Sequence, residues 1–158
     1  MANIVRLDIC EGKPRSFVMA QDVENGYFLE IKGKAQNVQL GGVDYEAYDV
    51  ELADADSKIE NVLFHKSVEN MYDERMMKQD FVLEAGRVGR GYVITRGDIV
   101  TIPATMADTK ALNAKLALGA DGKLVTAGAD NAIAVIEAVE DIVIPGAEPQ
   151  ESIVIRFL

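Results

Sequence analysis

The chain has 158 residues, 49% of them hydrophobic, which suffices for one domain with a substantial core. Its 16 basic and 26 acidic residues give a formal net charge of −10, which argues against binding to nucleic acid or to an anionic membrane surface. One cysteine and one histidine exclude an internal disulfide, a cysteine-cluster metal site and a two-histidine site. No signal peptide and no membrane-spanning stretch are predicted.

The first part of the chain alternates short apolar segments with turn residues, a pattern typical of β-strands. Near the N-terminus, Val5, Leu7 and Ile9 alternate with charged residues, which predicts a half-buried strand. Asn25-Gly26 predicts a turn, and a shift of phase at Ala47 suggests a β-bulge within a later strand. The strands expected here are 4–9, 17–20, 27–31, 43–52 and 62–64.

The remaining sequence continues in short segments, after one stretch without alternation. Residues 67–77 place apolar side chains on one helical face, which predicts a short helix or an ordered loop. Arg96-Gly97-Asp98 predicts a turn between two strands in 92–102, and Ala120-Asp121-Gly122 predicts the turn of a hairpin. At most one helical turn precedes that hairpin. Further strands are expected at 114–118, 123–126, 132–139, 142–144 and 153–157.

Many short strands separated by turns predict a mainly β fold. We expect a compact sandwich or barrel of short antiparallel strands, with at most one or two short helices and an extended N-terminal arm. Residues 1–24 are assigned to the arm and 25–158 to the β-rich domain, with a subdivision near 82–90 left open. A terminal strand of this kind can pair with a neighbouring protein, and the alternative is an ordinary edge strand of the domain.

Two groups of carboxylates are candidates for metal binding or acid–base chemistry. Asp54, Asp56 and Glu60 are spaced almost as in a calcium loop, but the central glycine is missing and the closing glutamate comes too early. Glu69, Asp73 and Glu74 offer paired carboxylates, as any acidic protein does. A solvated loop and a solvated acidic segment are the favoured interpretations.

Other candidate motifs lack the neighbours that their chemistry requires. His65 has no marked nucleophile or orienting acid, and Cys10 ends a strand without a nucleophile signature. The glycine-rich segment 86–91 does not have the spacing of a phosphate-binding loop. The tripeptide at 96–98 matches an integrin-binding motif, but three residues carry little specificity and a turn is expected there.

Arg87, Arg90 and Arg96 form a local basic cluster in an acidic chain. The cluster can form salt bridges with nearby acidic residues of the same chain. It can also meet an acidic surface on a partner protein. Both interpretations stay open at the level of the sequence.

Several stretches, taken in their order and spacing, resemble a family of phage proteins. The resemblance covers most of residues 25–158 and is to head decoration, or cement, proteins, which are encoded beside the major capsid protein in tailed phages of Gram-positive bacteria. The stretches are Asn25-Gly26-Tyr27-Phe28, 69–74 (Glu-Asn-Met-Tyr-Asp-Glu), 84–92 (Glu-Ala-Gly-Arg-Val-Gly-Arg-Gly-Tyr), 96–100 (Arg-Gly-Asp-Ile-Val), 121–125 (Asp-Gly-Lys-Leu-Val) and 132–136 (Ala-Ile-Ala-Val-Ile).

The resemblance implies a non-enzymatic virion protein that binds the exterior of the assembled capsid and stabilises it by bridging subunits of the major capsid protein. It implies an oligomer, with a trimer favoured, and neither a cofactor, a metal nor an active site. We expect backbone pairing by the N-terminal strand and salt links from two arginines. The candidate capsid contacts are Ile4, Val5, Leu7, Ile9, Arg87 and Arg90.

Three alternatives remain. The first is another virion component, such as a head-fibre base or a tail protein. The second is a small hydrolase that uses the carboxylates of 69–74, against which stands the absence of a recognisable triad, metal or phosphate motif. The third is a non-catalytic bacterial β-type binding module, for which the aromatic content of 6% argues mildly against sugar binding.

Overall fold

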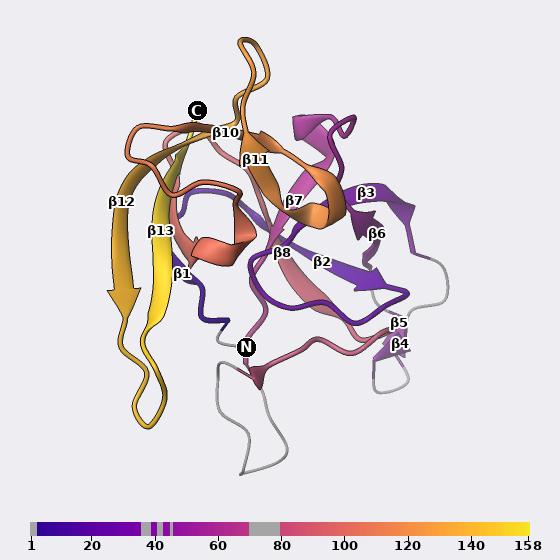
Figure 1. Ribbon diagram of the computed structural model, residues 1–158. Helices are drawn as coiled ribbons and strands as arrows, with labels where there is room; N and C mark the ends of the chain where they lie inside the picture. The colour runs from indigo at the N-terminus through magenta and orange to yellow at the C-terminus, as the bar shows by residue number, and fades with distance from the viewer. Residues whose placement is uncertain (1–2, 36–38, 41–42, 45, 70–79) are drawn as a thin grey trace.

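The structure is a computed structural model that describes residues 3–35, 39–40, 43–44, 46–69 and 80–158. As expected, the fold is mainly β: a closed five-stranded barrel, a six-stranded sheet and a two-stranded ribbon (Figure 1). Three short 3-10 turns lie wholly within these ranges: η1 (Ile59–Asn61), η3 (Ala104–Met106) and η4 (Ala120–Gly122). None of the described residues belongs to a helix that is long and apolar enough to cross a membrane.

The barrel closes because its first strand along the chain pairs on both of its sides. β2 pairs in parallel with β6 and antiparallel with β8, and the other neighbouring pairs are antiparallel. The expectation of antiparallel strands therefore fails for the β2–β6 pair. In spatial order the strands are β2 (Pro14–Met19), β6 (Tyr48–Leu52), β3 (Phe28–Lys34), β7 (Val62–His65) and β8 (Gly89–Val93).

The six-stranded sheet is antiparallel throughout and lies beside the barrel (Figure 1). In spatial order its strands are β1 (Arg6–Ile9), β9 (Ile99–Pro103), β13 (Gln150–Phe157), β12 (Ala134–Ile142), β10 (Lys115–Leu118) and β11 (Leu124–Thr126). The ribbon is formed by β4 (Gln39–Leu40) and β5 (Val43–Asp44).

β3 and β7 form a wall that the two assemblies share. Leu29 and Leu63, which are partners in the β3–β7 ladder, belong to the core inside the barrel. Phe28 and Phe64 point the other way, into the core between barrel and sheet, with their ring centroids 5.3 Å apart. Strands buried on both faces read as continuous apolar runs, which is why 62–64 shows no alternation.

The N-terminal segment is built into both assemblies. β1 pairs with β9 in the sheet, and β2 is a barrel strand. Residues 3–24 are therefore part of the body of the protein in this structure, and what we expected as an extended arm is an edge strand followed by a barrel strand. The reason is burial: Val5, Phe17 and Met19 all contribute to the two cores.

Of the two turns predicted at 120–122 and 96–98, one closes a hairpin and the other does not. The hairpin between β10 and β11 is confirmed, and Asp121 and Gly122 adopt φ values of 57° and 69° in its turn. Arg96-Gly97-Asp98 does connect two strands, but it is not a hairpin. β8 before it belongs to the barrel and β9 after it belongs to the sheet, so this turn carries the chain from one assembly to the other.

Two further expectations concern segments that the structure describes only in part. The shift of phase at Ala47 does not mark a bulge inside one strand, because β5 and β6 are separate strands with different partners. Residue 45 lies outside the described residues. A helix or loop was expected at 67–77, and residues 70–77 of it lie outside the described residues. Whether this segment is a helix or a loop therefore stays a prediction.

Candidate functional site

The four apolar candidates of the N-terminal strand do not present equivalent surfaces. Val5 is buried and Leu7 packs against the main core, so both side chains point inward. The backbone of Ile4 is fixed by Gln150: Ile4 N–H donates to Oε1 at 2.6 Å, and Nε2 donates to the Ile4 carbonyl at 2.8 Å. Ile9 is 52% exposed. Of the four, Ile9 is therefore the residue that offers a mostly exposed side chain to a partner.

β1 is an edge strand held in place by a polar cluster on the outer face of the sheet. The Arg6 guanidinium donates to Thr101 Oγ1 at 3.1 Å and forms ion pairs with Asp8 and with Glu140. Thr101 Oγ1 donates to Asp8 Oδ2 at 2.6 Å. Because Thr101 lies on β9 and Glu140 on β12, the cluster ties β1 to two other strands.

Arg87 and Arg90 lie in the barrel part of the chain, and the structure does not bring them into one assembly with β1. Arg87 is exposed and lies 3.6 Å from a carboxylate oxygen of Glu84. Arg90, on β8, is also exposed, and its guanidinium forms no ion pair with a carboxylate of the described residues. The salt-bridge interpretation of the basic cluster thus holds for Arg87, and the partner interpretation stays a prediction.

Two glycines of segment 86–91, Gly89 and Gly91, serve the packing of the barrel. A Cβ on Gly89 would lie 2.4 Å from Leu83 Cδ2 and 2.6 Å from the Phe17 ring. A Cβ on Gly91 would lie 2.9 Å from Leu63 Cβ. Neither position accepts a side chain without displacement of the barrel core, which explains the glycines without a bound phosphate.

Asp98 of the Arg-Gly-Asp tripeptide is a structural residue. It is 3% exposed, and its two carboxylate oxygens accept the backbone N–H groups of Glu11 at 2.9 Å and Gly12 at 3.0 Å. This carboxylate fastens the connection between β1 and β2. Burial, followed by the charge of Asp98, raises the pKa of the nearby Cys10 thiol, so Cys10 is less ionised than an ordinary cysteine.

His65 and Ser67 resemble a base–nucleophile pair, but both are buried. His65 Nδ1 lies 2.7 Å from the carbonyl oxygen of Glu24, which can only accept, so Nδ1 carries the proton. The Ser67 hydroxyl therefore donates to Nε2 over 2.7 Å, and its oxygen accepts the Arg90 N–H at 3.0 Å. Burial lowers the pKa of His65 to about 4. The pair is a satisfied internal network.

Asn25 completes this network from the neighbouring turn. Its side chain accepts the N–H of Ser67 at 2.8 Å and donates to the Ser67 carbonyl at 3.1 Å. The turn before β3 is thereby joined to the chain that follows β7. Asn25-Gly26, a stretch that carries the family resemblance, is thus a structural feature of the barrel.

The acidic loop at 54–60 is closed by its own hydrogen bonds. Asp54 Oδ1 accepts the backbone N–H of Asp56 at 2.9 Å and the hydroxyl of Ser57 at 3.2 Å. Glu69 forms an ion pair with Lys66, and residues 70–74 lie outside the described ranges. Within the described part of the chain, no three His, Cys, Asp or Glu side chains are grouped to hold a metal ion.

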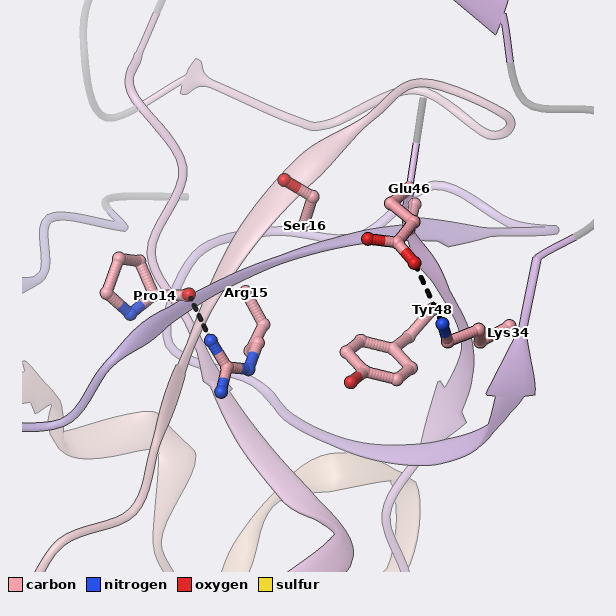
Figure 2. A pocket seen from close by; sticks show the side chains of 7 residues that line it. Pro14, Arg15, Ser16, Lys34, Glu46 and Tyr48 are labelled. Carbon is pink, nitrogen blue, oxygen red and sulfur yellow. Dashed lines mark hydrogen bonds and ion pairs between the residues drawn. The ribbon is translucent and has the colours of Figure 1, made fainter. Parts of the chain in front are cut away.

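The structure shows one candidate site that the sequence analysis missed, a hollow of about 340 Å³ at one end of the barrel (Figure 2). It lies where β2 and β6 begin and β3 ends. An ion pair between Lys34 Nζ and Glu46 Oε1, 2.8 Å long, lies at its rim. The lining residues are Pro14, Arg15, Ser16, Lys34, Glu46, Ala47 and Tyr48.

Electrostatics at this barrel mouth follow from the ion pair. The hydrogen bond and charge of Lys34 lower the pKa of Glu46, and Glu46 raises the pKa of Lys34 in the same way. Both groups therefore stay charged at neutral pH and neutralise each other. The signal available in the sequence was the position of Arg15, two residues before Phe17 on an inward-facing strand.

No protein-family model matches the chain, and no curated protein is significantly similar to it. A solved structure described as the crystal structure of head fiber gp8.5 N base in bacteriophage phi29 is similar to it. The two share 10% sequence identity with a TM-score of 0.47, over 92% of this chain and 93% of that chain. A TM-score below 0.5 at this identity carries no argument about function.

Proposed function

We propose that this protein is a structural, non-enzymatic component of a tailed-phage virion that binds the exterior of the assembled capsid and bridges subunits of the major capsid protein. The observation that carries the proposal is the position of β1 at the edge of the six-stranded sheet, paired with β9 on one side. An edge strand offers backbone groups to a neighbouring chain, and Ile9 adds an exposed apolar side chain beside them.

The stretches behind the family resemblance support the proposal through their roles in the fold. Asn25 belongs to the buried network, Gly89 and Gly91 let the barrel core close, and Asp98 fastens the junction of barrel and sheet. Each of these residues has a structural role in the architecture. A resemblance built on them favours a shared structural role over a shared reaction.

The contact at β1 must be short and selective. The register with β9 shifts between Leu7 and Ile9, and charged Arg6 and Asp8 flank the edge; both features limit indiscriminate strand pairing. A short contact binds weakly, so we propose that copies act together as an oligomer, with a trimer favoured. Binding to the intact shell but not to its separated subunits would then stabilise the shell by mass action.

The experiment is co-sedimentation of the protein with assembled shells of the major capsid protein. Deleting the N-terminal strand is unsuitable, because Val5 belongs to the core. We instead compare Ile9→Glu with Ile59→Glu, a matched change at a residue that is 40% exposed on η1. Ile9→Glu should weaken shell binding by at least about tenfold, which is about 1.4 kcal/mol, while Ile59→Glu should leave it unchanged.

A second pair of variants separates the arginine contact from the strand contact. Arg90→Gln should weaken binding only if the barrel surface also faces the capsid, and Arg96→Gln serves as its exposed control. Equal binding by the wild type and Ile9→Glu would overturn the role of β1. Binding to tail tubes or fibres in place of shells would support the alternative of a head-fibre base or tail protein and overturn the capsid proposal.

A further inference from the structure

Arg15 is exposed, and its place in β2 puts it on the side of the strand that faces the barrel interior. Side chains alternate along β2, and Phe17 and Met19 lie in the core inside the barrel, so Arg15 shares their direction one layer further out. Tyr48, the partner of Phe17 in β6, packs against the same core. Opposite Arg15 on β8 stands Gly91, which contributes no side chain to this layer. The mouth therefore contains an arginine and a phenol above an apolar floor.

Among the described residues, no carboxylate forms an ion pair with Arg15. Its guanidinium contacts the carbonyl oxygen of Pro14 at 3.5 Å, and it forms no ion pair with the described acidic residues (Figure 2). Glu46 is the acidic residue of the lining, and it is engaged by Lys34. The lining thus carries two basic side chains, Arg15 and Lys34, and one acidic side chain, Glu46, in a chain of net charge −10.

The shape of the hollow suits an extended segment. The pairing of β2 with β6 begins at Phe17 and Tyr48, so residues 14–16 and 46–47 border the hollow without pairing to each other. Its volume of about 340 Å³ is near the lower end of the range for ligand pockets, about 300–1,000 Å³, and holds one or two side chains.

We propose that the barrel mouth binds a carboxylate side chain carried on an extended segment of a partner protein. A guanidinium fork donates two parallel hydrogen bonds to a carboxylate, and the Tyr48 ring supplies an apolar wall for its methylene groups. The inference goes beyond the proposed function and does not rest on it, because the partner is defined by its carboxylate alone.

The test is an amide chemical-shift titration of the full chain with a blocked pentapeptide that has a central glutamate. Saturable shifts are expected at Ser16, Ala47 and Tyr48, and a peptide with glutamine at the centre should bind at least about tenfold more weakly. Glutarate should bind more weakly than the glutamate peptide. Equal binding of glutarate would overturn a protein segment as the ligand, and no saturable shift at the mouth would overturn the site.

Charge variants should change the peptide affinity in opposite directions, which a purely structural role of these residues would not produce. Arg15→Gln should weaken peptide binding by at least about tenfold, and Arg96→Gln, at an exposed arginine in the turn before β9, should not change it. Glu46→Gln should tighten binding, because it removes a negative charge from the lining of the mouth. Lys34→Gln should weaken it, because it releases Glu46. If Glu46→Gln and Lys34→Gln, both at exposed side chains, shift affinity in the same direction, the proposal fails even where Arg15→Gln does not fold.

Discussion

The barrel and the six-stranded sheet bury their residues by different means. The barrel closes around a small core in which Gly89 and Gly91 leave room for Phe17 and Leu63. The sheet uses ordinary alternation: β13 turns Ile153, Ile155 and Phe157 to the core and Val154 and Arg156 away from it. β3 and β7 belong to both cores, so their two faces are buried at once.

This difference predicts where substitutions are costly. In the shared wall, adjacent side chains are buried in opposite cores at Phe28 and Leu29 of β3 and at Leu63 and Phe64 of β7, whereas a strand with one buried face has tolerant positions. The joint between the assemblies runs from β1 through Gly12 to β2. Substitutions there are costly for a different reason, because the backbone at Gly12 lies close to the backbone of Val93.

The largest effect is expected in the shared wall. Phe64→Ala should lower the free energy of unfolding by about 3–5 kcal/mol and Leu63→Ala by about 2–5 kcal/mol, although the two side chains point in opposite directions. Val139→Ala on β12, where the side chain is 40% exposed, should cost less than about 1 kcal/mol. Urea unfolding measures all three, and a tolerant face on β7 would refute the two-sided wall.

The next effect concerns the joint. A Cβ on Gly12 would lie 2.0 Å from the carbonyl oxygen of Val93, which is backbone and cannot rotate away. Gly12→Ala should therefore cost about 3 kcal/mol. Gly128→Ala is the control, since the nearest atom to its Cβ would be 3.5 Å away, and it should change stability by less than about 1 kcal/mol in thermal unfolding. Equal costs for both variants would contradict the account of the joint.

A pH-dependent effect is expected from the barrel network. Burial places the pKa of His65 at about 4 in the folded state, below the usual value of 6.5, so the unfolded chain takes up the proton first. Stability contributed by neutral His65 is present above pH 6.5 and is lost as the pH falls toward 4, by up to about 3 kcal/mol.

The measurement is urea unfolding of the wild type and His65→Gln between pH 7 and 4. Carboxylates titrate in both proteins, so the difference between the two pH profiles isolates His65. We expect the wild type to lose more stability than the variant across this range. Parallel profiles would show that the histidine titrates normally and that the network is not closed.

The smallest effect is expected on the outer face of the sheet. Arg6 joins β1 to β9 and β12, but its side chain is 48% exposed, so solvent screens its ion pairs. Arg6→Gln should lower the free energy of unfolding by less than about 1 kcal/mol, and the difference should shrink in high salt. A larger, salt-independent loss would show that this cluster stabilises β1 more than Val5 and the backbone hydrogen bonds to β9 do.

The sequence predicted strands better than it predicted their partners. Alternation located β13 and the turn chemistry of Asp121-Gly122 identified the β10–β11 hairpin, because both signals are local. The sequence could not show that Arg96-Gly97-Asp98 connects the barrel to the sheet, because the same turn residues occur in hairpins and in connections between sheets. The parallel pairing of β2 with β6 likewise depends on closure of the barrel, which no local pattern encodes.

The candidate site was predictable only in part. Ile9 and Arg90 are exposed, as residues that contact a partner must be. Val5 and Leu7 were selected because they alternate with charged residues, and the same alternation places them in or against the core. A strand with one buried face turns its apolar residues inward, so the pattern that reveals the strand also hides these side chains from a partner. Arg15 is inconspicuous in the sequence, because Lys34 and residues 46–48, which line the same barrel mouth, come from two distant segments.

The most direct test of the central claim is size-exclusion chromatography with light-scattering mass detection, on the protein alone and mixed with assembled capsid shells. We expect an oligomer that co-elutes with the shells and saturates at a fixed number of copies per shell. That number would indicate the symmetry position occupied. A monomer that elutes apart from the shells at every concentration would contradict the capsid role.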